Sequence, residues 1–396
     1  MKARLGTKAE TLSVLYGQLE CAQVLPQYTF TVGEWNGKRK DIIQTFDGIK
    51  WNKSVIVRSS SLSEDTDVSS QAGKYESIAD VKGKLEFERA VDEVITSYDD
   101  LNPMNQVLVQ PMLADVVICG VAFTLDPNTL GNYYVINYDR TGSTSAITSG
   151  SGNESCLYYH FKASGAEIAP KELGNLIAAL QELEDFFEQD NLDVEFSITA
   201  DGNLYILQVR ILCVGTTRVE LARQKDELER ICRKIQCNQS PKPFLCGDRT
   251  AYSVMTDWNP AEMIGVRPKP LSMSLYREII TDSVWAYQRD NYGYRNLRSF
   301  PLMVDFCGLP YIDVRVSFNS FIPADLDEGI SEKLVDYYLE RLIQNPEKHD
   351  KAEFEIVYSC YTLDLPERIQ VLREYGFTGE EIEKILVSLR NVTNQI

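Results

Sequence analysis

A segment around residue 58 combines an arginine with hydroxyl side chains in a pattern that suits phosphate binding. Arg58 ends the β-rich run 54–57, and serines occupy positions 59–61. A guanidinium group can bind two phosphate oxygens at once. Gly73, further along the same polar stretch, would let backbone N–H groups approach those oxygens. The stretch can equally be a solvated loop after an edge strand, so on its own it leaves both interpretations open.

A second group of polar residues is expected on one face of a hairpin. Asp201-Gly202 is typical of a two-residue turn between strands. With these two residues as the loop, Glu195 faces Gln208. Asp193 then faces Arg210, and alternation along the strands puts all four on the same face. The opposite, apolar face would consist of Val194, Phe196, Tyr205, Leu207 and Val209.

These four polar side chains predict a magnesium–nucleotide site. Carboxylate and amide oxygens are ligands that Mg²⁺ prefers, and a guanidinium suits phosphate. The alternative is a surface hairpin with one cross-strand ion pair, which would contribute about 0.2–1 kcal/mol. A register error of one residue would exchange the two faces.

The elements that would position these residues are mixed in the first half of the chain and mostly helical afterwards. Helices are expected over 7–19 (with Thr7 as N-cap), 85–98, 170–188 and 219–237. Strands are expected over 27–32, 54–57, 106–112, 116–124, 133–137, 192–198 and 204–209, and a loop over 141–152. We therefore expect an α+β domain over 1–215, a helix and linker over 216–245, and a mostly helical domain over 246–396.

Composition excludes several classes of protein. The chain has 396 residues, 44% of them apolar, which is enough for two or three globular domains. Its net charge of −18 argues against nucleic acid or an anionic membrane as a general partner. Nine cysteines occur without a C-x-x-C pair, and we expect reduced thiols in a cytoplasmic protein. No apolar run is long enough to predict a membrane span or a signal peptide.

Five motifs in order resemble the nucleotide-binding domain of phosphoenolpyruvate synthase and pyruvate phosphate dikinase, which belongs to the ATP-grasp class. They are Val57-Arg58-Ser59-Ser60, Ala72-Gly73-Lys74-Tyr75-Glu76-Ser77, Gly120-Val121-Ala122-Phe123-Thr124-Leu125-Asp126-Pro127, Asp193-Val194-Glu195-Phe196 and Ile206-Leu207-Gln208-Val209-Arg210. The segment 5–12 resembles a further family motif that contains a lysine, here Lys8. The resemblance implies a two-lobed ATP-grasp-type domain over 1–215.

The same resemblance implies roles for individual residues. Lys8, Arg58 and Arg210 would contact the ATP phosphates and form the catalytic set. Glu195 and Gln208 would hold Mg²⁺, and the loop around Gly73 would cover the phosphates. The full ATP-binding set is Lys8, Arg58, Gly73, Gln110, Met112, Thr124, Asp193, Glu195, Gln208 and Arg210. Gln110 and Met112 would offer backbone groups to adenine, and for Met112 core packing is an equal alternative.

The chain departs from the family pattern in two places. Residues 137–152 lack the family's usual G-L-G-E segment and resemble a subgroup from capsule and lipopolysaccharide clusters, which includes the L-glutamine kinase of capsular phosphoramidate synthesis. Full-length members carry phosphate on a histidine of a swivelling domain. Neither His160 nor His349 lies in such a motif, so we expect the phosphohistidine domain and the phosphoenolpyruvate-binding barrel to be missing from this chain.

The segment 257–272 resembles the start of an acceptor-binding domain in the same kinases. Trp258, with Arg267 or Arg315 to hold a carboxylate, is a candidate acceptor pocket, although a core position is favoured for Trp258. The resemblance implies a dikinase-like phosphotransferase that converts ATP to AMP through phosphohistidine. The amide nitrogen of glutamine is the first candidate acceptor, ahead of pyruvate or a capsule precursor. The alternatives are a fragment of a pyruvate, water dikinase-like enzyme, a non-catalytic ATP-binding module, and direct ligation through an acylphosphate that releases ADP.

Overall fold

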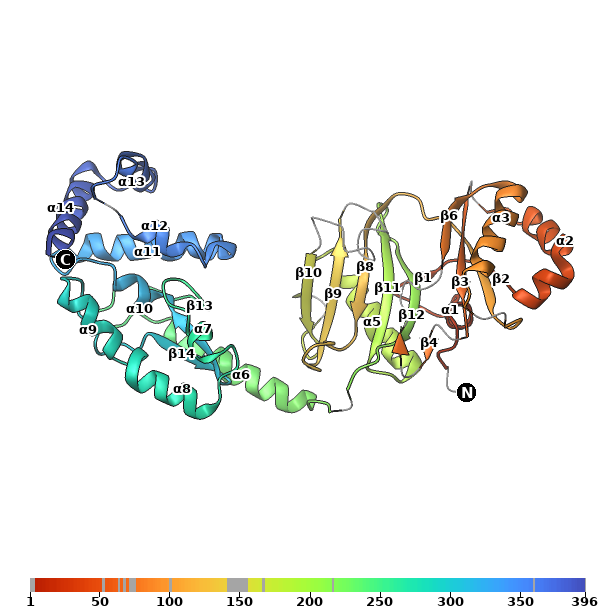
Figure 1. The fold of residues 1–396 in the computed structure, drawn as a ribbon, viewed down its shortest axis with the longest axis horizontal. Helices are drawn as coiled ribbons and strands as arrows, with labels where there is room; N and C mark the ends of the chain where they lie inside the picture. The colour runs from red at the N-terminus through yellow and green to blue at the C-terminus, as the bar shows by residue number, and fades with distance from the viewer. Residues whose placement is uncertain are drawn as a thin grey trace. The chain divides into compact units, whose positions relative to one another are not determined.

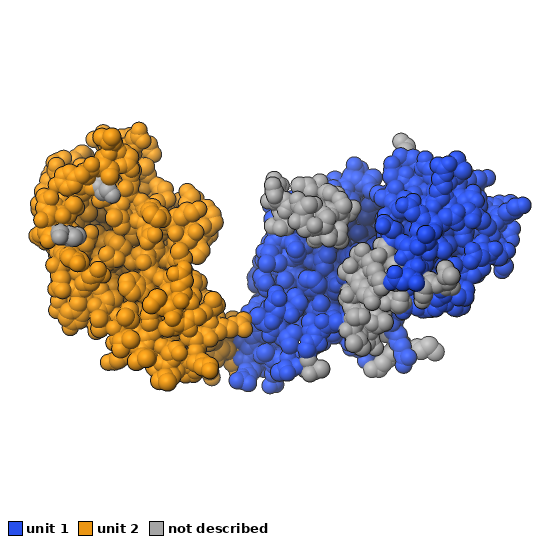
Figure 2. All heavy atoms as spheres, viewed as in Figure 1, with its two compact units in different colours: residues 1–225 blue, residues 226–396 orange. Residues whose placement is uncertain are grey.

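The structure, a computed structural model, describes residues 4–51, 54–62, 65–66, 69–70, 76–99, 102–140, 156–165, 168–215, 217–358 and 360–395. The chain divides into two compact units, residues 1–225 and 226–396, drawn in blue and orange in Figure 2. The division falls within helix α6 (Leu221–Asn238), inside the segment that the sequence predicted as helix and linker.

The first sheet of unit 1 is antiparallel and has four strands (Figure 1). Its strand order is β2 (Tyr28–Thr31), β7 (Gln106–Pro111), β3 (Val55–Ser60) and β6 (Ser77–Val81). Val57 and Val109 pair across the sheet and point into a core with Trp35 of α2 (Val32–Gly48) and Phe87 of α3 (Gly83–Thr96). Strand alternation therefore turns Arg58 away from this core. Nearby, the short strands β4 (Asp65–Thr66) and β5 (Ser69–Ser70) pair with each other.

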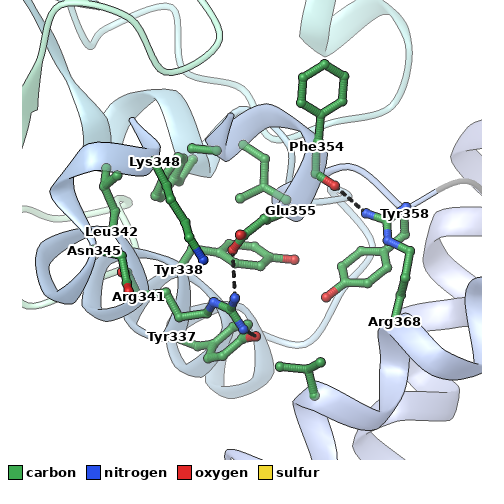
Figure 3. A pocket seen from close by; sticks show the side chains of 14 residues that line it. Tyr337, Tyr338, Arg341, Leu342, Asn345, Lys348, Phe354, Glu355, Tyr358 and Arg368 are labelled. Atoms are coloured by element: carbon green, nitrogen blue, oxygen red, sulfur yellow. Dashed lines mark hydrogen bonds and ion pairs between the residues drawn. The ribbon is translucent and has the colours of Figure 1, made fainter. Parts of the chain in front are cut away.

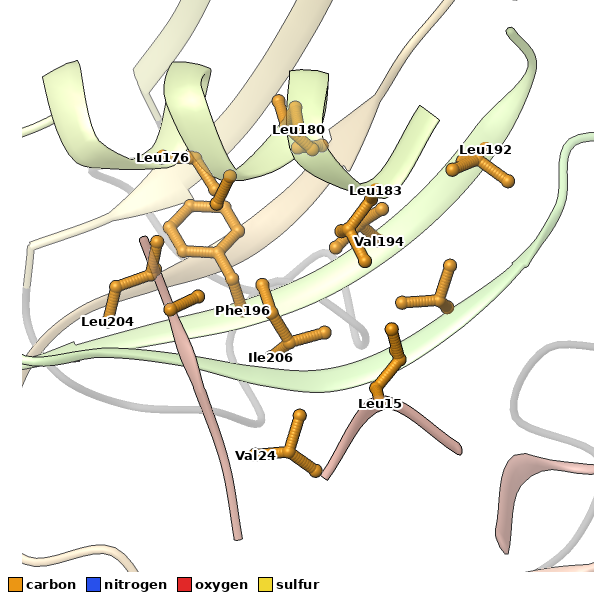
Figure 4. Packing of buried hydrophobic residues seen from close by; sticks show 14 of the residues in the cluster. Leu15, Val24, Leu176, Leu180, Leu183, Leu192, Val194, Phe196, Leu204 and Ile206 are labelled. Atoms are coloured by element: carbon orange, nitrogen blue, oxygen red, sulfur yellow. The ribbon is translucent and has the colours of Figure 1, made fainter. Parts of the chain in front are cut away.

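The second sheet of unit 1 has six strands. Their order is β1 (Gln23–Val24), β12 (Leu204–Ile211), β11 (Leu192–Thr199), β8 (Val116–Phe123), β9 (Tyr133–Asp139) and β10 (Cys156–Phe161). Helix α5 (Gly174–Phe187) lies over one face, where Leu176, Leu180 and Leu183 pack against β11 and β12 (Figure 4). Gly120 permits close strand contact, since a Cβ there would lie 2.3 Å from the Asn137 carbonyl oxygen.

Helix α1 (Lys8–Leu15) joins the two sheets. It begins at the predicted N-cap, where Thr7 and Glu10 form a capping box. The Thr7 hydroxyl also donates to the Gln106 side chain of β7 at 2.7 Å. The backbone N–H of Ala9 donates to the Ser60 hydroxyl of β3 at 2.9 Å. Leu12 and Leu15 lie in the core of the second sheet. This one short helix is therefore held by both sheets of unit 1.

The β11–β12 hairpin has the predicted residue pairs at the site, but its register between the turn and the site differs from the prediction. Glu195 pairs with Gln208, and Asp193 pairs with Arg210, as expected. Between the turn and these pairs, however, the register is shifted by one residue, and a bulge beside Glu195 and Phe196 restores it. The bulge inserts Leu207, because Gln208 pairs with Glu195 whereas Ile206 pairs with Phe196.

The bulge corrects the prediction of the apolar face. Tyr205 and Leu207 were expected beneath the hairpin, but Leu204 and Ile206 occupy those core positions instead. Tyr205 and Leu207 are only partly buried. The other three predicted core residues, Val194, Phe196 and Val209, lie in the core as expected.

Unit 2 is mostly helical, as expected, with one small sheet. The sheet has the order β13 (Tyr252–Ser253), β15 (Leu309–Asp313) and β14 (Met303–Phe306). The helices are α7 (Pro260–Ile264), α8 (Pro270–Tyr276), α9 (Val284–Asn291), α10 (Val314–Asn319), α11 (Glu328–Gln344), α12 (Ala352–Ile356), α13 (Leu365–Glu374) and α14 (Gly379–Gln395). The largest core of the unit lies among α10, α11, α13 and α14.

The elements that were not predicted from the sequence include helix α2, strands β1, β6 and β10, and the β14–β15 hairpin. The loop expected over 141–152 lies outside the described residues. Within the described parts of the chain, no helix combines the length and apolarity needed to cross a membrane.

Candidate functional site

Arg58 reaches from the first sheet of unit 1 to the second. Its Nη2 lies 3.2 Å from Glu195 Oε2, and its Nη1 donates to the Leu207 carbonyl oxygen at 3.1 Å. The carbonyl belongs to the residue that the β12 bulge inserts. The Arg58 side chain is only 12% exposed, so the contact is largely shielded from solvent. The two predicted halves of the site therefore meet through this one guanidinium.

Asp193 and Arg210 form a second ion pair on the same face of the hairpin. Arg210 Nε donates to Asp193 Oδ2 at 2.7 Å, and both side chains are at most 10% exposed. Cross-strand pairing brings the two residues opposite each other, and the extended chain holds the pair in register. The site therefore holds two carboxylates, each bound to a guanidinium.

Lys8 completes a cluster of three cations around Glu195. Burial of Glu195 favours its neutral form, but the charges of Arg58, Lys8 and Arg210 lower its pKa below the ordinary value. Lys8 is itself buried, at the first turn of α1. All three residues predicted to contact phosphate thus act electrostatically on one carboxylate.

The pKa of Asp193 shifts in the opposite direction. Burial raises it, the charge of Arg210 opposes the rise, and the like charge of Glu195 adds to it. Glu195 is held as an anion by surplus positive charge, whereas Asp193 depends on a single cation. Neighbouring carboxylates with opposite shifts are typical of sites built to handle charge.

Several buried polar atoms around the cluster lack a hydrogen-bond partner among the residues that the structure describes. They are Arg58 Nε, Asp193 Oδ1, Gln208 Nε2 and Gln110 Nε2. Unsatisfied buried polar atoms are uncommon in folded proteins, and a group of them indicates a place for a polar ligand. Gln110 lies on the Arg58 face of the first sheet, because it pairs with Ile56 two residues before Arg58.

The donor set fits a nucleotide with Mg²⁺. Glu195 and Gln208 face each other and offer the carboxylate and amide oxygens that Mg²⁺ prefers. No group of three or more His, Cys, Asp or Glu side chains suited to a metal occurs in the described residues. A cation here would therefore need further oxygens, which nucleotide phosphates can provide.

The remaining predicted ATP-binding residues have mixed positions. The Met112 N–H donates to the Ser54 carbonyl at 3.1 Å, which continues the β3–β7 pairing. Thr124 is fully buried, and its hydroxyl accepts from the Leu192 N–H at 2.7 Å. In the structure Thr124 therefore joins the end of β8 to the start of β11. Gly73 lies outside the described residues.

The three predicted acceptor-binding residues are not gathered in one described pocket. Arg315 is fully buried, and its guanidinium donates to the carbonyls of Asn238, Ser240 and Gly247. Trp258 packs partly against a core and donates to the Tyr276 hydroxyl at 2.6 Å, which agrees with the favoured core interpretation. Arg267 is exposed in the segment between α7 and α8.

Sequence reasoning missed three parts of the site. Ser60 and Gln106 fix the start of α1, and Ser60 was visible as part of the Val57-Arg58-Ser59-Ser60 motif. The Leu207 carbonyl was not foreseen, because nothing in the residue types around it marks a bulge.

Comparison with known proteins matches part of unit 1 to a nucleotide-binding family. Residues 39–151 match the family model described as pyruvate phosphate dikinase, AMP/ATP-binding domain. The match includes Arg58 and ends before the β11–β12 hairpin. With the two sheets of unit 1, it confirms the expected α+β fold of the ATP-grasp class and supports an ATP-using enzyme. No curated protein matches the sequence.

Among solved structures, the chain is similar to several ligases at low identity. D-alanine–D-alanine ligase from Helicobacter pylori is 14% identical with a TM-score of 0.32, and the match covers 52% of this chain and 57% of the ligase. The ligase from Coxiella burnetii is also 14% identical with a TM-score of 0.32, covering 58% of this chain and 61% of the ligase. The chain thus spans little more than half the length of these ligases.

Proposed function

We propose that unit 1 binds ATP with Mg²⁺ and forms the ATP-using part of a dikinase-like phosphotransferase. The observation that carries this proposal is Arg58. It lies within the segment that matches the AMP/ATP-binding family model, and its guanidinium contacts the predicted magnesium-binding Glu195 on the other sheet. The cation proposed to bind phosphate and the carboxylate proposed to bind the metal are therefore neighbours, which supports a magnesium–nucleotide site.

The chain would contribute positioning and charge. Lys8, Arg58 and Arg210 would bind phosphate oxygens of ATP and stabilise charge that develops during transfer. Glu195 and Gln208 would hold Mg²⁺, which when bound neutralises phosphate charge. Asp193 would orient Arg210 through the 2.7 Å ion pair.

Binding would require an exchange of partners. Both guanidiniums contact carboxylates, so a phosphate that engages Arg58 Nη2 competes with Glu195. The displaced carboxylate then needs another positive charge, since leaving it buried and unpaired is costly. We therefore expect ATP and Mg²⁺ to bind cooperatively.

The proposed reaction follows the family that the sequence resembles. The β- and γ-phosphates of ATP would pass together to a histidine on a separate domain, which yields AMP. Water would then remove one of the two as inorganic phosphate, and the remaining phosphohistidine would phosphorylate a small acceptor. The amide nitrogen of L-glutamine, as in capsular phosphoramidate synthesis, remains the first candidate acceptor, ahead of pyruvate or a capsule precursor.

All nine cysteines are free thiols, which supports a cytoplasmic location.

The test combines calorimetry with product analysis. ATP is titrated with and without Mg²⁺, and products are followed by phosphorus NMR with and without a separately supplied phosphohistidine domain. AMP that forms only with that domain supports the proposal. AMP formed without it would contradict the carrier mechanism, ADP would instead favour ligation through an acylphosphate, and failure to bind ATP would overturn the whole assignment.

A non-catalytic ATP-binding module is the second candidate, favoured by the positions of the histidines. His160 is buried beside the Tyr158 hydroxyl and the Ser164 carbonyl. His349 Nδ1 lies 3.2 Å from the Ser253 hydroxyl. Both imidazoles thus contact groups of the surrounding fold, which suits a structural role. Binding of ATP without product, even with the phosphohistidine domain present, would favour this candidate.

A further inference from the structure

Unit 2 contains a pocket that the proposed function does not use. It lies among α10, α11, the 3₁₀ turn Pro346–Lys348, α12 and α13, and has a volume of about 180 Å³ (Figure 3). An engineered cavity of about 150 Å³ can hold benzene, so a single six-membered ring would fit. The pocket opens to the surface and lies entirely within residues 318–371 of unit 2.

The charged lining of this pocket is mostly positive. Arg341, Lys348 and Arg368 line it together with one acid, Glu355. Figure 3 shows Arg341, Lys348 and Glu355 gathered on one side and Arg368 on the other. In a chain with a net charge of −18, three cations around one small pocket are a local reversal of charge. Such a surplus attracts anions.

The cations differ in how far they are already engaged. Arg341 lies 3.0 Å from the Glu355 carboxylate and donates to the Tyr337 hydroxyl at 3.0 Å. Arg368 donates to the carbonyls of Phe354 and Val357, at the end of α12. Lys348 is exposed, and its ammonium group has no hydrogen-bond or ion-pair partner among the residues described. Two fixed cations and one available cation thus surround the pocket.

Aromatic rings form much of the rest of the wall. Tyr337, Tyr338 and Tyr358 line the pocket, and the Arg368 guanidinium lies 5.0 Å from the centre of the Tyr358 ring. Burial raises the pKa of Tyr358 to about 12, so its hydroxyl stays neutral and able to donate a hydrogen bond. Flat walls with a few placed polar groups are typical of small-molecule sites.

We propose that this pocket binds a small organic anion, with a carboxylate or phosphate group on a planar, single-ring body. The anionic group would lie against Lys348 and Arg341, and the ring would pack between the tyrosines. This inference goes beyond the proposed function, because it needs neither ATP nor the residues of unit 1.

The test uses benzoate, phenyl phosphate and benzyl alcohol as probes, followed by ligand-observed NMR on the full chain. We expect at least one anion to bind with a dissociation constant of about 1 mM, and benzyl alcohol to bind at least about tenfold more weakly because it lacks the charge. Preference for benzoate or for phenyl phosphate identifies the anionic group. Equal binding of benzyl alcohol, or no binding of either anion, would overturn the proposal.

Variants locate the site and separate binding from folding. Lys348→Ala should weaken anion binding about fivefold, as expected for one exposed charge contact. Lys351→Ala is the matched control, because Lys351 is exposed three residues further on but does not line the pocket. Glu355→Gln should strengthen binding severalfold, since Arg341 loses its competing carboxylate. A misfolded variant could not bind more tightly, so unchanged or weaker binding by Glu355→Gln would contradict the proposal.

Discussion

Positive side chains gather in two places in this acidic protein, the cluster around Arg58 and the pocket around Lys348. The two places differ in how far their cations are paired with carboxylates. In the Arg58 cluster, both carboxylates contact guanidiniums, and Lys8 is buried beside them. In the pocket of unit 2, three cations face one acid, and Lys348 is exposed.

This difference indicates two kinds of ligand. A cluster whose charges already pair with one another must exchange partners to admit an anion, and a cation that accompanies the anion makes the exchange favourable. A pocket with surplus positive charge can accept an anion directly. We therefore expect metal-dependent binding in unit 1 and metal-independent binding in unit 2.

Removing Arg58 should have the largest effect on this contrast. Arg58→Ala should weaken ATP binding by about tenfold to a hundredfold, because hydrogen bonds to charged groups contribute about 1.5–3 kcal/mol. Arg39→Ala is the matched control, since Arg39 also pairs with acids, Glu88 and Asp92, within the first lobe. Thermal unfolding first confirms that both variants fold, and calorimetry then measures the ATP affinity of each. Equal affinities would remove Arg58 from the site.

Neutralising Glu195 should make the unit 1 cluster behave like the pocket. In Glu195→Gln, Mg²⁺ should improve ATP affinity by less than about twofold, compared with about tenfold or more in the wild type. With EDTA present, the variant should bind ATP more tightly than the wild type, because Arg58 no longer contacts a carboxylate.

Glu172→Gln is the control for this experiment, because Glu172 pairs with Arg140 at 2.6 Å in the same unit. It should keep the full Mg²⁺ effect. If Glu195→Gln also retains that effect, the carboxylate neither holds the metal nor competes with phosphate.

The two carboxylates of the hairpin should change acid stability in opposite directions. The pKa of Glu195 is lowered in the folded state, so its contribution to stability is present above about pH 4.3 and is lost as pH falls through the folded value. The pKa of Asp193 is raised, so the folded state binds its proton more readily than the unfolded state above about pH 3.9.

It follows that Glu195→Gln should lose less unfolding free energy than the wild type on acidification, and Asp193→Asn should lose more. Urea unfolding between about pH 3 and pH 7 measures both slopes. Slopes that change in the same direction in the two variants would contradict the assigned charge environments.

The smallest effect should come from the cap that positions Lys8. Thr7→Ala removes the capping box of α1 and should cost about 1 kcal/mol of stability. It should also weaken ATP binding by about twofold to fivefold, since one charged contact is loosened. Thr31→Ala removes the equivalent capping box of α2 and should cost similar stability without affecting ATP. Equal effects on ATP would show that the α1 cap does not position Lys8.

The sequence predicted those parts of the site that depend on local pattern. The Thr7 cap, the strand that carries Arg58 and the polar face of the hairpin follow from residue type and alternation, although the strand continues two residues beyond Arg58 to Ser60. The contact between Arg58 and Glu195 joins residues far apart in the chain. The motifs put both residues in one site, but no local pattern specifies their distance.

Other features depend on tertiary packing that no single stretch of sequence specifies. Arg315 was predicted from its charge as an acceptor ligand, but its surroundings give it three backbone carbonyls. Helix α2 has a polar average composition and is held by packing of Trp35 against Phe30 and Phe87, which periodicity alone does not reveal. The pocket of unit 2 is built from helices α10 to α13 and the 3₁₀ turn after α11, and their meeting point is likewise set by packing.

The bulge at Leu207 determines which single-residue deletions the hairpin can tolerate. Leu207 is the extra residue of the bulge, since Ile206 and Gln208 pair with the neighbouring residues Phe196 and Glu195. Deleting it would join these two pairs in regular register and keep Gln208, Val209 and Arg210 on their present faces. The deletion would instead remove the carbonyl oxygen that accepts a hydrogen bond from Arg58. A deletion scan along β12 should therefore find that the hairpin tolerates the loss of Leu207 better than the loss of its buried neighbours, whereas ATP binding is weakened.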